Sequence, residues 1–287
     1  TSLLCQHARR HVTVALGGDG ADELFAGYAP FRALRWASYY QKLVPGPLHT
    51  AIRLLANRLP VGDGYMSLDF KLKRTLQGLS HPPRLWHPSW MCPLDDAALA
   101  ECFMEPVDPE EVFSEAIAAW ERCSQPNLVD RSLQFFTDIY LQDDILAKVD
   151  RASMMHSLEV RSPFLDINVV DLARKIPSEY KLRHGETKYI LKKALARILP
   201  QDILQRPKQG FAVPIAKWLR DDGLQLDESS ALAGLNGAFI AKTVADYRQH
   251  NSNRHHFLWG QWTLAQVMQR HTALVNTPST AETVHAL

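Results

Sequence analysis

Residues 12–28 have the sequence Val-Thr-Val-Ala-Leu-Gly-Gly-Asp-Gly-Ala-Asp-Glu-Leu-Phe-Ala-Gly-Tyr, and this stretch decides which fold and chemistry we predict. Its first five residues form an apolar, β-branched run that is typical of a short, buried strand in a parallel sheet. Gly17, Gly18 and Gly20 allow a sharp turn and let backbone N–H groups approach a ligand. A helix that begins near Ala21 would add the positive end of its dipole. The stretch therefore predicts an anion site between a strand and a helix.

Three carboxylates lie in the same turn. Asp19, Asp22 and Glu23 have the spacing i, i+3 and i+4, so we expect them to crowd onto one side of the first helical turn. Helix N-termini favour acids, so one or two could be dipole partners, whereas three together favour a cation or a proton. An EF-hand is excluded because its sixth and twelfth positions fall on Leu24 and Pro30. The better interpretation is phosphate with Mg²⁺, which is typically held by one or two carboxylates and the phosphates of a substrate.

Twelve consecutive residues of this stretch resemble a family signature. Residues 17–28 are similar to the pattern (S/G)-G-(E/D)-G-(A/G)-D-E-(L/V)-F-x-G-Y of asparagine synthetases, in their ATP-using synthetase domain. The resemblance implies an α/β fold, in which the remnant of a parallel nucleotide-binding sheet of the adenine nucleotide α-hydrolase type precedes a mostly α-helical region. It also implies ATP and Mg²⁺ as cofactors.

Composition limits the class of protein. The chain has 287 residues, is 46% hydrophobic and carries a formal net charge of +1, so it is long enough for one large or two modest cores, and no overall field favours nucleic acid or a membrane. No apolar run approaches the length of a membrane span, and no signal peptide is visible. We expect a cytoplasmic protein with reduced, structural thiols, because no C-x-x-C spacing links its cysteines, which are Cys5, Cys92, Cys102 and Cys123.

Most of the remaining chain shows helical periodicity. The pattern predicts two helices within 30–59 that are separated by a turn at 45–47, and further helices at 66–79, 108–122, from 127 through 140, at 142–155, 238–249 and 254–272. Prolines and tryptophans in 80–108 predict an irregular, partly buried connector. We expect three parts: 1–28 as strand, loop and helix of the sheet, 29–274 as the helical remainder, and 275–287 as a disordered tail.

A second block, residues 141–166, resembles the asparagine synthetase segment that ends D-R-x-S-M-x-x-(S/G)-x-E-x-R-x-P-F-L-D. In the family this segment lies beside the synthetase site. The resemblance therefore makes Asp150, Arg151, Glu159 and Arg161 candidates for shaping the substrate pocket or bracing its loop. Glu159 and Arg161 alternate with a valine, as in an extended segment whose two charges face one way. Bracing is slightly favoured for this pair.

A third block, residues 185–195, predicts a helix with Lys188 in its first turn. A cation there opposes the helix dipole, which suggests an anionic ligand. Lys188 also aligns with the (E/T)-K-x-(I/L)-L-(R/K) lysine of the family, which is taken to neutralise phosphate charge during adenylation. Residues 206–214 match the family's R-x-K-x-G-F-x-x-P loop, so Lys208 is a weaker candidate for binding phosphate.

The resemblance implies a reaction in two steps. The side-chain carboxylate of aspartate attacks the α-phosphate of ATP to give a β-aspartyl-adenylate and pyrophosphate, and ammonia then displaces AMP to give asparagine. Backbone groups of Gly17, Gly18 and Gly20 would hold the nucleotide, Asp22 would carry Mg²⁺-pyrophosphate, and Lys188 would offset phosphate charge. Asp19 takes the acid position near the reacting centre, where well-studied members have Glu, and would help to deprotonate the attacking amine.

Two parts of the family pattern do not occur in the sequence: the S-G-G-x-D-S pyrophosphate loop and the glutaminase domain that supplies ammonia from glutamine. We therefore expect a piece of a longer chain that carries this domain and is inactive as the piece alone. A homodimer is left open. Two alternatives also remain open: a related adenylating amidotransferase or β-lactam-forming synthetase with another substrate, and a non-catalytic binding module. Retention of Asp19, Asp22, Lys188 and Lys208 argues against the binding module.

Overall fold

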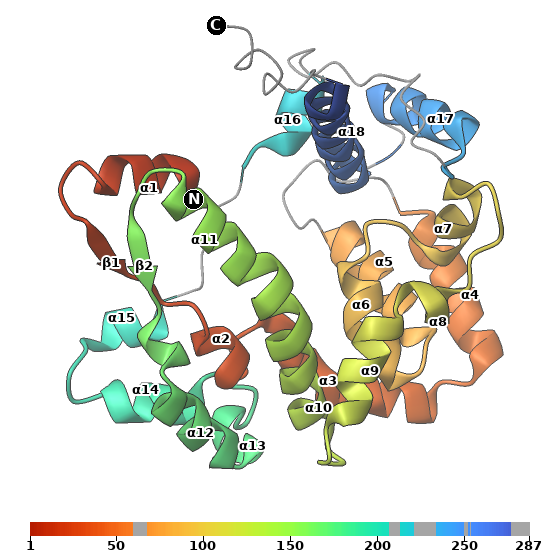
Figure 1. The fold of residues 1–287 in the computed structure, drawn as a ribbon. Coiled ribbons are helices and arrows are strands. Elements are labelled where there is room, and N and C mark those ends of the chain that lie inside the picture. Colours follow the sequence, from red (N-terminus) through yellow and green to blue (C-terminus); the bar gives the residue numbers. More distant parts are fainter. Residues whose placement is uncertain (60–67, 207–212, 221–233, 250–251, 253, 277–287) are drawn as a thin grey trace, which may run out of the picture. The chain divides into compact units, whose positions relative to one another are not determined.

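The computed structural model describes residues 1–287 except 60–67, 207–212, 221–233, 250–251, 253 and 277–287 (Figure 1). The chain divides into two compact units. Unit 1 comprises Thr1–Leu54, Thr75–Trp90 and Phe113–Gln209, and unit 2 comprises Leu55–Arg74, Met91–Val112 and Gly210–Leu287. Each unit is thus built from segments that are distant in the sequence.

Helices dominate both units, and the two strands lie in unit 1. In chain order the elements are α1 (Ser2–Ala8), β1 (Val14–Leu16), α2 (Ala21–Leu24), α3 (Ala29–Leu43), α4 (Gly46–Asn57), α5 (Leu68–Leu79), η1 (Pro83–Leu85), α6 (Trp86–Met91), α7 (Asp96–Cys102), α8 (Pro109–Val112), α9 (Ser114–Arg122), α10 (Leu128–Phe135), η2 (Phe136–Leu146), α11 (Ala147–Met154), β2 (Glu159–Arg161), η3 (Pro163–Leu165), α12 (Ile167–Lys175), α13 (Ser178–Lys181), α14 (Tyr189–Leu195), α15 (Gln201–Gln205), α16 (Ile215–Arg220), α17 (Gly237–Arg248) and α18 (His255–Asn276). The described chain is thus mostly helical, with a small α/β element near its start.

β1 and β2 form a parallel two-stranded sheet, in which Val14 pairs with Glu159 and Leu16 with Arg161. The parallel pairing confirms the sequence-based expectation. The expectation of a buried strand is wrong, because Val14 is 41% exposed and Leu16 is 74% exposed. Within the described residues the sheet has only these two strands, so few side chains are available to cover β1. Figure 1 shows α1 and α11 beside the sheet, and α11 packs against both α1 and β2.

The helices α10, η2 and α11 follow one another without a break, and η2 is wound as a π-helix. The sequence pattern predicts α-helix on both sides of residue 141 but does not predict the wider winding. Adjacent Phe135 and Phe136 are both buried at the junction of α10 and η2. Single-turn π-bulges are often found at functional sites, and η2 is considerably longer. Its position next to α2 makes it part of the site described below.

An aromatic core holds unit 1 together. Phe31 and Trp86 are fully buried, and both pack with Phe135 and Phe136 in one apolar cluster. His87 lies among these rings, and its Nε2 is 2.6 Å from the hydroxyl of Ser132. Burial lowers the pKa of His87 to about 3, so this side chain is neutral at ordinary pH. Trp86, which lies in the segment 80–108 that the sequence predicts to be partly buried, therefore packs in this core.

A separate core forms unit 2. Its most deeply buried members are Val244, Tyr247 and Leu258, which come from α17 and α18. The hydroxyl of Tyr247 donates to the carbonyl of Ala216 at 2.8 Å. Residues from α7 and α16 complete the cluster, so segments from both ends of the unit share one interior.

Most predicted helix positions are confirmed, with two corrections of extent. The helix expected at 108–122 is interrupted at Phe113, which separates α8 from α9, and the last helix runs on to Asn276. The expectation of an irregular connector at 80–108 is wrong, because this segment contains η1, α6 and α7. The expected tail at 277–287 lies outside the described residues. All four cysteines have free thiols. In the described part of the chain, no helix combines the length and apolar character that a membrane crossing requires.

Candidate functional site

The turn between β1 and α2 has the predicted strand, glycine loop and helix. Gly20 caps α2 in the left-handed conformation with φ of 91°. A Cβ at this position would lie 2.4 Å from Cδ2 of Leu165, in the segment that follows β2. Glycine is therefore required here by both backbone conformation and space. The first and second sequence blocks thus meet at this turn.

The backbone of the turn is partly engaged. The N–H of Gly17 donates to the carbonyl of Arg161 at 2.8 Å and so extends the sheet pairing by one residue. Gly18 is exposed, and no atom lies within 4 Å of the position a Cβ would take. Gly18 is consequently the more accessible of the two for a ligand. Because α2 is a single turn, its dipole is small, and the dipole contribution expected from the sequence is weak.

The three carboxylates of the turn do not crowd together, which corrects the expectation from the sequence. Asp19 accepts from the hydroxyl of Ser162 at 3.4 Å, and Glu23 accepts from the hydroxyl of Tyr28. Asp22 forms an ion pair with Lys188. Asp19 precedes the left-handed cap at Gly20 and is therefore not on the helix, so helical spacing does not apply to it. In the described residues, no three His, Cys, Asp or Glu side chains gather as a metal site.

Asp22 and Lys188 join the first and third sequence blocks. The Nζ of Lys188 lies 2.9 Å from Oδ1 of Asp22, and the two side chains are 26% and 21% exposed. The pair passes over Gly27, where an added Cβ would lie 1.9 Å from Oδ1 of Asp22 and 2.3 Å from Cε of Lys188. Gly27 therefore provides the space in which the two charges meet.

Lys188 is the N-cap of α14 and not a residue of its first turn, which corrects the prediction. Its φ is 53°, a left-handed conformation that is uncommon for a residue other than glycine. Its N–H donates to the carbonyl of Phe25 at 3.1 Å, next to Ala26, which has φ of 54°. Two strained residues thus lie side by side in the segments that carry the ion pair. Such strain clusters at functional sites, where the surrounding structure maintains it.

Tyr28 is a site residue that no sequence pattern indicates, and its partner is Glu23, which the sequence indicates only as one of three acids in the turn. Glu23 is only 2% exposed, and its partner Tyr28 stacks on Phe136 with ring centroids 4.8 Å apart. Tyr140 contacts the ring of Tyr28 edge-on, with ring centroids 5.5 Å apart. Burial first, and then the hydrogen bond to Glu23, raise the pKa of Tyr28 far above its usual value, so it stays protonated and donates. Phe136 and Tyr140 belong to η2, so this π-helix supports the turn that carries Asp22.

Apolar packing fixes the same arrangement from the other side. Leu24 and Phe25 form a small cluster with Ala173 of α12, and partly buried residues of η3 and α14 pack against it. In Figure 1 these elements lie together below the sheet. The three sequence blocks therefore converge through a shared core as well as through polar contacts.

The second block contributes an exposed ion pair. Nε of Arg161 lies 2.7 Å from Oε1 of Glu159, and these side chains are 67% and 53% exposed. The shared face is as predicted. Asp150 and Arg151 are exposed on α11, and within the described residues their side chains form no ion pair with the site. Lys208 lies outside the described residues. The structure thus brings together Asp22 and Lys188, Asp19 and Ser162, and Glu159 and Arg161.

Comparison with known proteins identifies the family. The asparagine synthase family matches residues 1–272. Asparagine synthetase (glutamine-hydrolysing) 1 of Bacillus subtilis is 31% identical over 274 residues, which are 90% of this chain and 40% of that protein. A putative glutamine-hydrolysing asparagine synthetase of Mycobacterium bovis is 33% identical over 269 residues, which are 88% of this chain and 37% of the relative. This chain therefore spans about two fifths of the length of these relatives, and it belongs to the asparagine synthase family.

Proposed function

We propose that this chain forms the pyrophosphate-handling part of an ATP-dependent ligase that converts aspartate to asparagine through a β-aspartyl-adenylate. The single observation that carries the proposal is the ion pair between Asp22 and Lys188, since it joins two sequence blocks at the glycine turn. Family membership supports the reaction class. The turn with its exposed Gly18 supports nucleotide binding, and we propose that the small parallel sheet is part of a nucleotide-binding sheet of the adenine nucleotide α-hydrolase type.

Asp22 is the residue that we propose for Mg²⁺. Mg²⁺ is commonly held by one or two carboxylates together with phosphate oxygens and water, so a single partly exposed carboxylate fits this ion without a cluster of three ligands. When bound, the ion would neutralise charge on the pyrophosphate. Asp22 would position it, and Gly27 would keep the space around this carboxylate open.

Lys188 would stabilise the negative charge that develops as the α- and β-phosphates separate. Its side chain is already aimed at the turn because Asp22 holds it there at 2.9 Å. The left-handed backbone conformation of Lys188 sets the direction in which its side chain leaves the main chain. Gly18 and Gly20 would let the nucleotide approach the turn closely, and Lys208 would add a second cation.

Asp19 is proposed to help deprotonate the amine that attacks the adenylate. Its carboxylate accepts from Ser162 at 3.4 Å, a contact long enough to be readily exchanged for a substrate. The kinetic test is Asp19→Ala, with asparagine formation measured against pyrophosphate release. We expect the first rate to fall more than the second. Equal rates to the unchanged protein in both assays would remove Asp19 from the mechanism.

The proposed partners follow from the relatives, which are named as glutamine-hydrolysing enzymes. We propose that a glutaminase domain on the full-length chain supplies ammonia. An S-G-G-x-D-S loop in the same full-length chain would complete the pyrophosphate site, so that residues 1–287 alone would not form the adenylate. Asp150, Arg151, Glu159 and Arg161 would border the aspartate pocket, and a cytoplasmic location remains part of the proposal.

The test uses the full-length protein with ATP, Mg²⁺, glutamine and a panel of carboxylic acids. We expect aspartate to give asparagine and pyrophosphate in equal amounts, while glutamate and other acids give neither. Pyrophosphate release with a different acid would identify an adenylating enzyme with another substrate. Absence of release with every acid would contradict the proposal and favour a binding module.

A further inference from the structure

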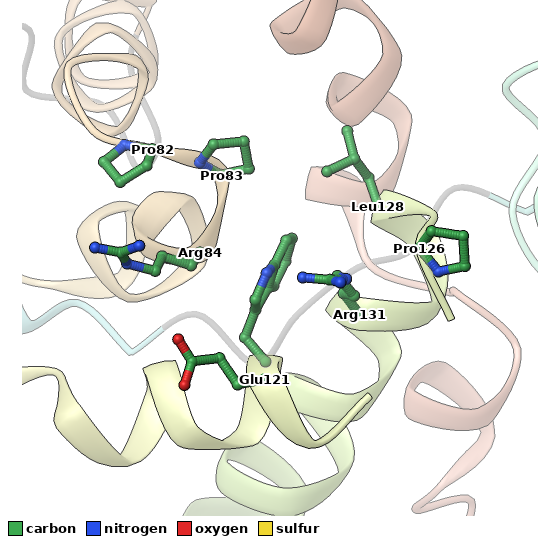
Figure 2. A pocket seen from close by; sticks show the side chains of 8 residues that line it. Pro82, Pro83, Arg84, Glu121, Pro126, Leu128 and Arg131 are labelled. Atoms are coloured by element: carbon green, nitrogen blue, oxygen red, sulfur yellow. The ribbon is translucent and has the colours of Figure 1, made fainter. Parts of the chain in front are cut away.

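A cavity in unit 1 lies outside the candidate site. It has a volume of about 300 Å³ and opens between η1, α9 and α10. Figure 2 shows prolines of its lining from two segments, Pro82 and Pro83 from one and Pro126 from the other, and Trp120 also belongs to the lining. Trp120 is only 5% exposed, so it forms a fixed wall. The volume is at the lower end of the range for small-molecule sites, which are commonly apolar with a few polar groups.

Charged groups border this apolar wall. Arg84 and Arg131 contribute two positive charges to the lining, and Glu121 contributes one negative charge. Figure 2 shows Arg84 and Arg131 on opposite sides of the lining, with Glu121 below and between them. In the described part of the chain, no carboxylate forms an ion pair with Arg131. The lining is therefore positive by one charge, and Arg131 is one of its two cations.

Arg131 is held in place without being neutralised. Its guanidinium carbon lies 5.8 Å from the centroid of Trp120, within the range of a cation–π contact. Its Nε donates to the carbonyl of Gln125 at 3.1 Å. Both contacts fix the plane of the guanidinium, and the backbone carbonyl uses Nε, which leaves the terminal nitrogens for other acceptors. Since prolines and a buried indole also restrict the lining, a ligand would meet a pre-formed site and lose little entropy to ordering it.

We propose that this cavity binds a small organic anion, an aromatic carboxylate whose ring lies against the prolines while its carboxylate takes the terminal nitrogens of Arg131. A planar guanidinium matches a carboxylate in two parallel hydrogen bonds. The ring supplies apolar surface for contact with the prolines and Leu128 of the lining. None of these residues belongs to the proposed synthetase site, so the two proposals can be tested separately.

The test is isothermal titration calorimetry of the full-length protein with phenylacetate as the probe and phenethylamine as a ligand of matched shape and opposite charge. We expect saturable binding of phenylacetate in the millimolar range or tighter, and none of phenethylamine. Arg131→Gln should weaken phenylacetate binding at least tenfold, because it removes the bidentate partner. Equal binding of the two probes, or no saturable binding of phenylacetate, would overturn the proposal.

Two variants separate this result from a folding defect. Arg122→Gln is the matched control, since Arg122 is a neighbouring arginine that pairs with Asp138 at 2.7 Å and does not line the cavity. It should leave the affinity within twofold. Glu121→Gln removes the acid beside the cavity and should tighten phenylacetate binding severalfold, a gain that misfolding does not produce. An unchanged affinity in both Arg131→Gln and Glu121→Gln would contradict the assignment.

Discussion

The glycine turn and the aromatic core of unit 1 are held together by different means. The turn joins a strand of three residues to a helix of four, and single polar contacts hold it, such as the pair between Asp22 and Lys188. The core instead buries whole rings, with Phe31 and Trp86 fully covered. Short elements cannot bury enough apolar surface to fix themselves. The turn therefore depends on its neighbours, and Tyr28 provides one connection by stacking on Phe136 of the core.

This difference separates stability from chemistry. Apolar burial in the core contributes most of the free energy of unfolding of unit 1, whereas the turn leaves partly exposed charges and strained backbone that could serve a ligand. Substitutions in the core should consequently lower the free energy of unfolding more than those at the glycine turn or the sheet. Substitutions at the turn should lower the rate of pyrophosphate release more than those in the core.

The largest effect on stability is expected for Phe31→Ala. Removing a fully buried ring leaves a cavity, and the free energy of unfolding should fall by about 3–5 kcal/mol. Leu16→Ala is the control on β1, and because this side chain is 74% exposed, its effect should stay within about 0.5 kcal/mol. Urea unfolding of the full-length protein measures both. Similar losses in the two variants would show that the sheet and the core do not differ in the way described.

Gly27→Ala should have the next largest effect. The added Cβ would overlap Oδ1 of Asp22, so the ion pair with Lys188 must move, at a cost of about 1–3 kcal/mol. Gly46→Ala is the matched control, because no atom lies within 4 Å of that Cβ position. Urea unfolding and pyrophosphate release are measured together. If Gly27→Ala matched Gly46→Ala in both, the space over Gly27 would not be needed.

The buried histidine predicts how stability depends on pH. The pKa of His87 is about 3 in the folded chain and about 6.5 when unfolded, so the unfolded chain binds more protons between these values. The contribution of His87 is fully present above pH 6.5 and falls by about 1.4 kcal/mol per unit as the pH drops below it. His87→Gln should flatten this slope in urea unfolding measured at a series of pH values. An unchanged slope in His87→Gln would contradict a neutral buried imidazole.

The smallest effect is expected for Glu159→Gln. The carboxylate of Glu159 is 2.7 Å from Arg161, but both side chains are more than half exposed, and water and salt screen such a pair. The free energy of unfolding should change by less than about 1 kcal/mol, as measured by urea unfolding at low and high salt. A larger, salt-independent loss would mean that the pair braces β2 more firmly than its exposure suggests.

Local patterns in the sequence predict the elements but not their surroundings. The apolar run before Gly17 predicts a parallel strand, and the glycines predict the turn, because both depend on residues close in the chain. The exposure of Leu16 depends on how many strands and helices surround it, which no local pattern contains. The π-winding of η2 was missed for a similar reason, since apolar spacing does not distinguish it from α-helix.

The sequence predicts which residues belong to the candidate site but not which of them contact one another. Asp22 and Lys188 were singled out separately, but their ion pair required the fold to bring distant segments together. Helical spacing groups Glu23 with the other acids because it does not reveal burial. The contact between Glu23 and Tyr28, five residues later, depends on the fold. The expectation that Asp19 crowds against Asp22 is wrong, because the left-handed Gly20 places Asp19 outside the helix.

The most direct test of the central claim is the rate of aspartate-dependent pyrophosphate release by the full-length protein carrying Lys188→Gln. Its control is Lys192→Gln, because Lys192 lies in α14, the helix that Lys188 caps, and pairs with Glu186 at 3.2 Å and not with Asp22. We predict that Lys188→Gln lowers the rate by about 10²–10³-fold, as expected when a charge that stabilises a transition state is removed. Lys192→Gln should stay within twofold. Equal rates in the two variants, with both proteins folded, would contradict the assignment of the Asp22 and Lys188 pair to the pyrophosphate site.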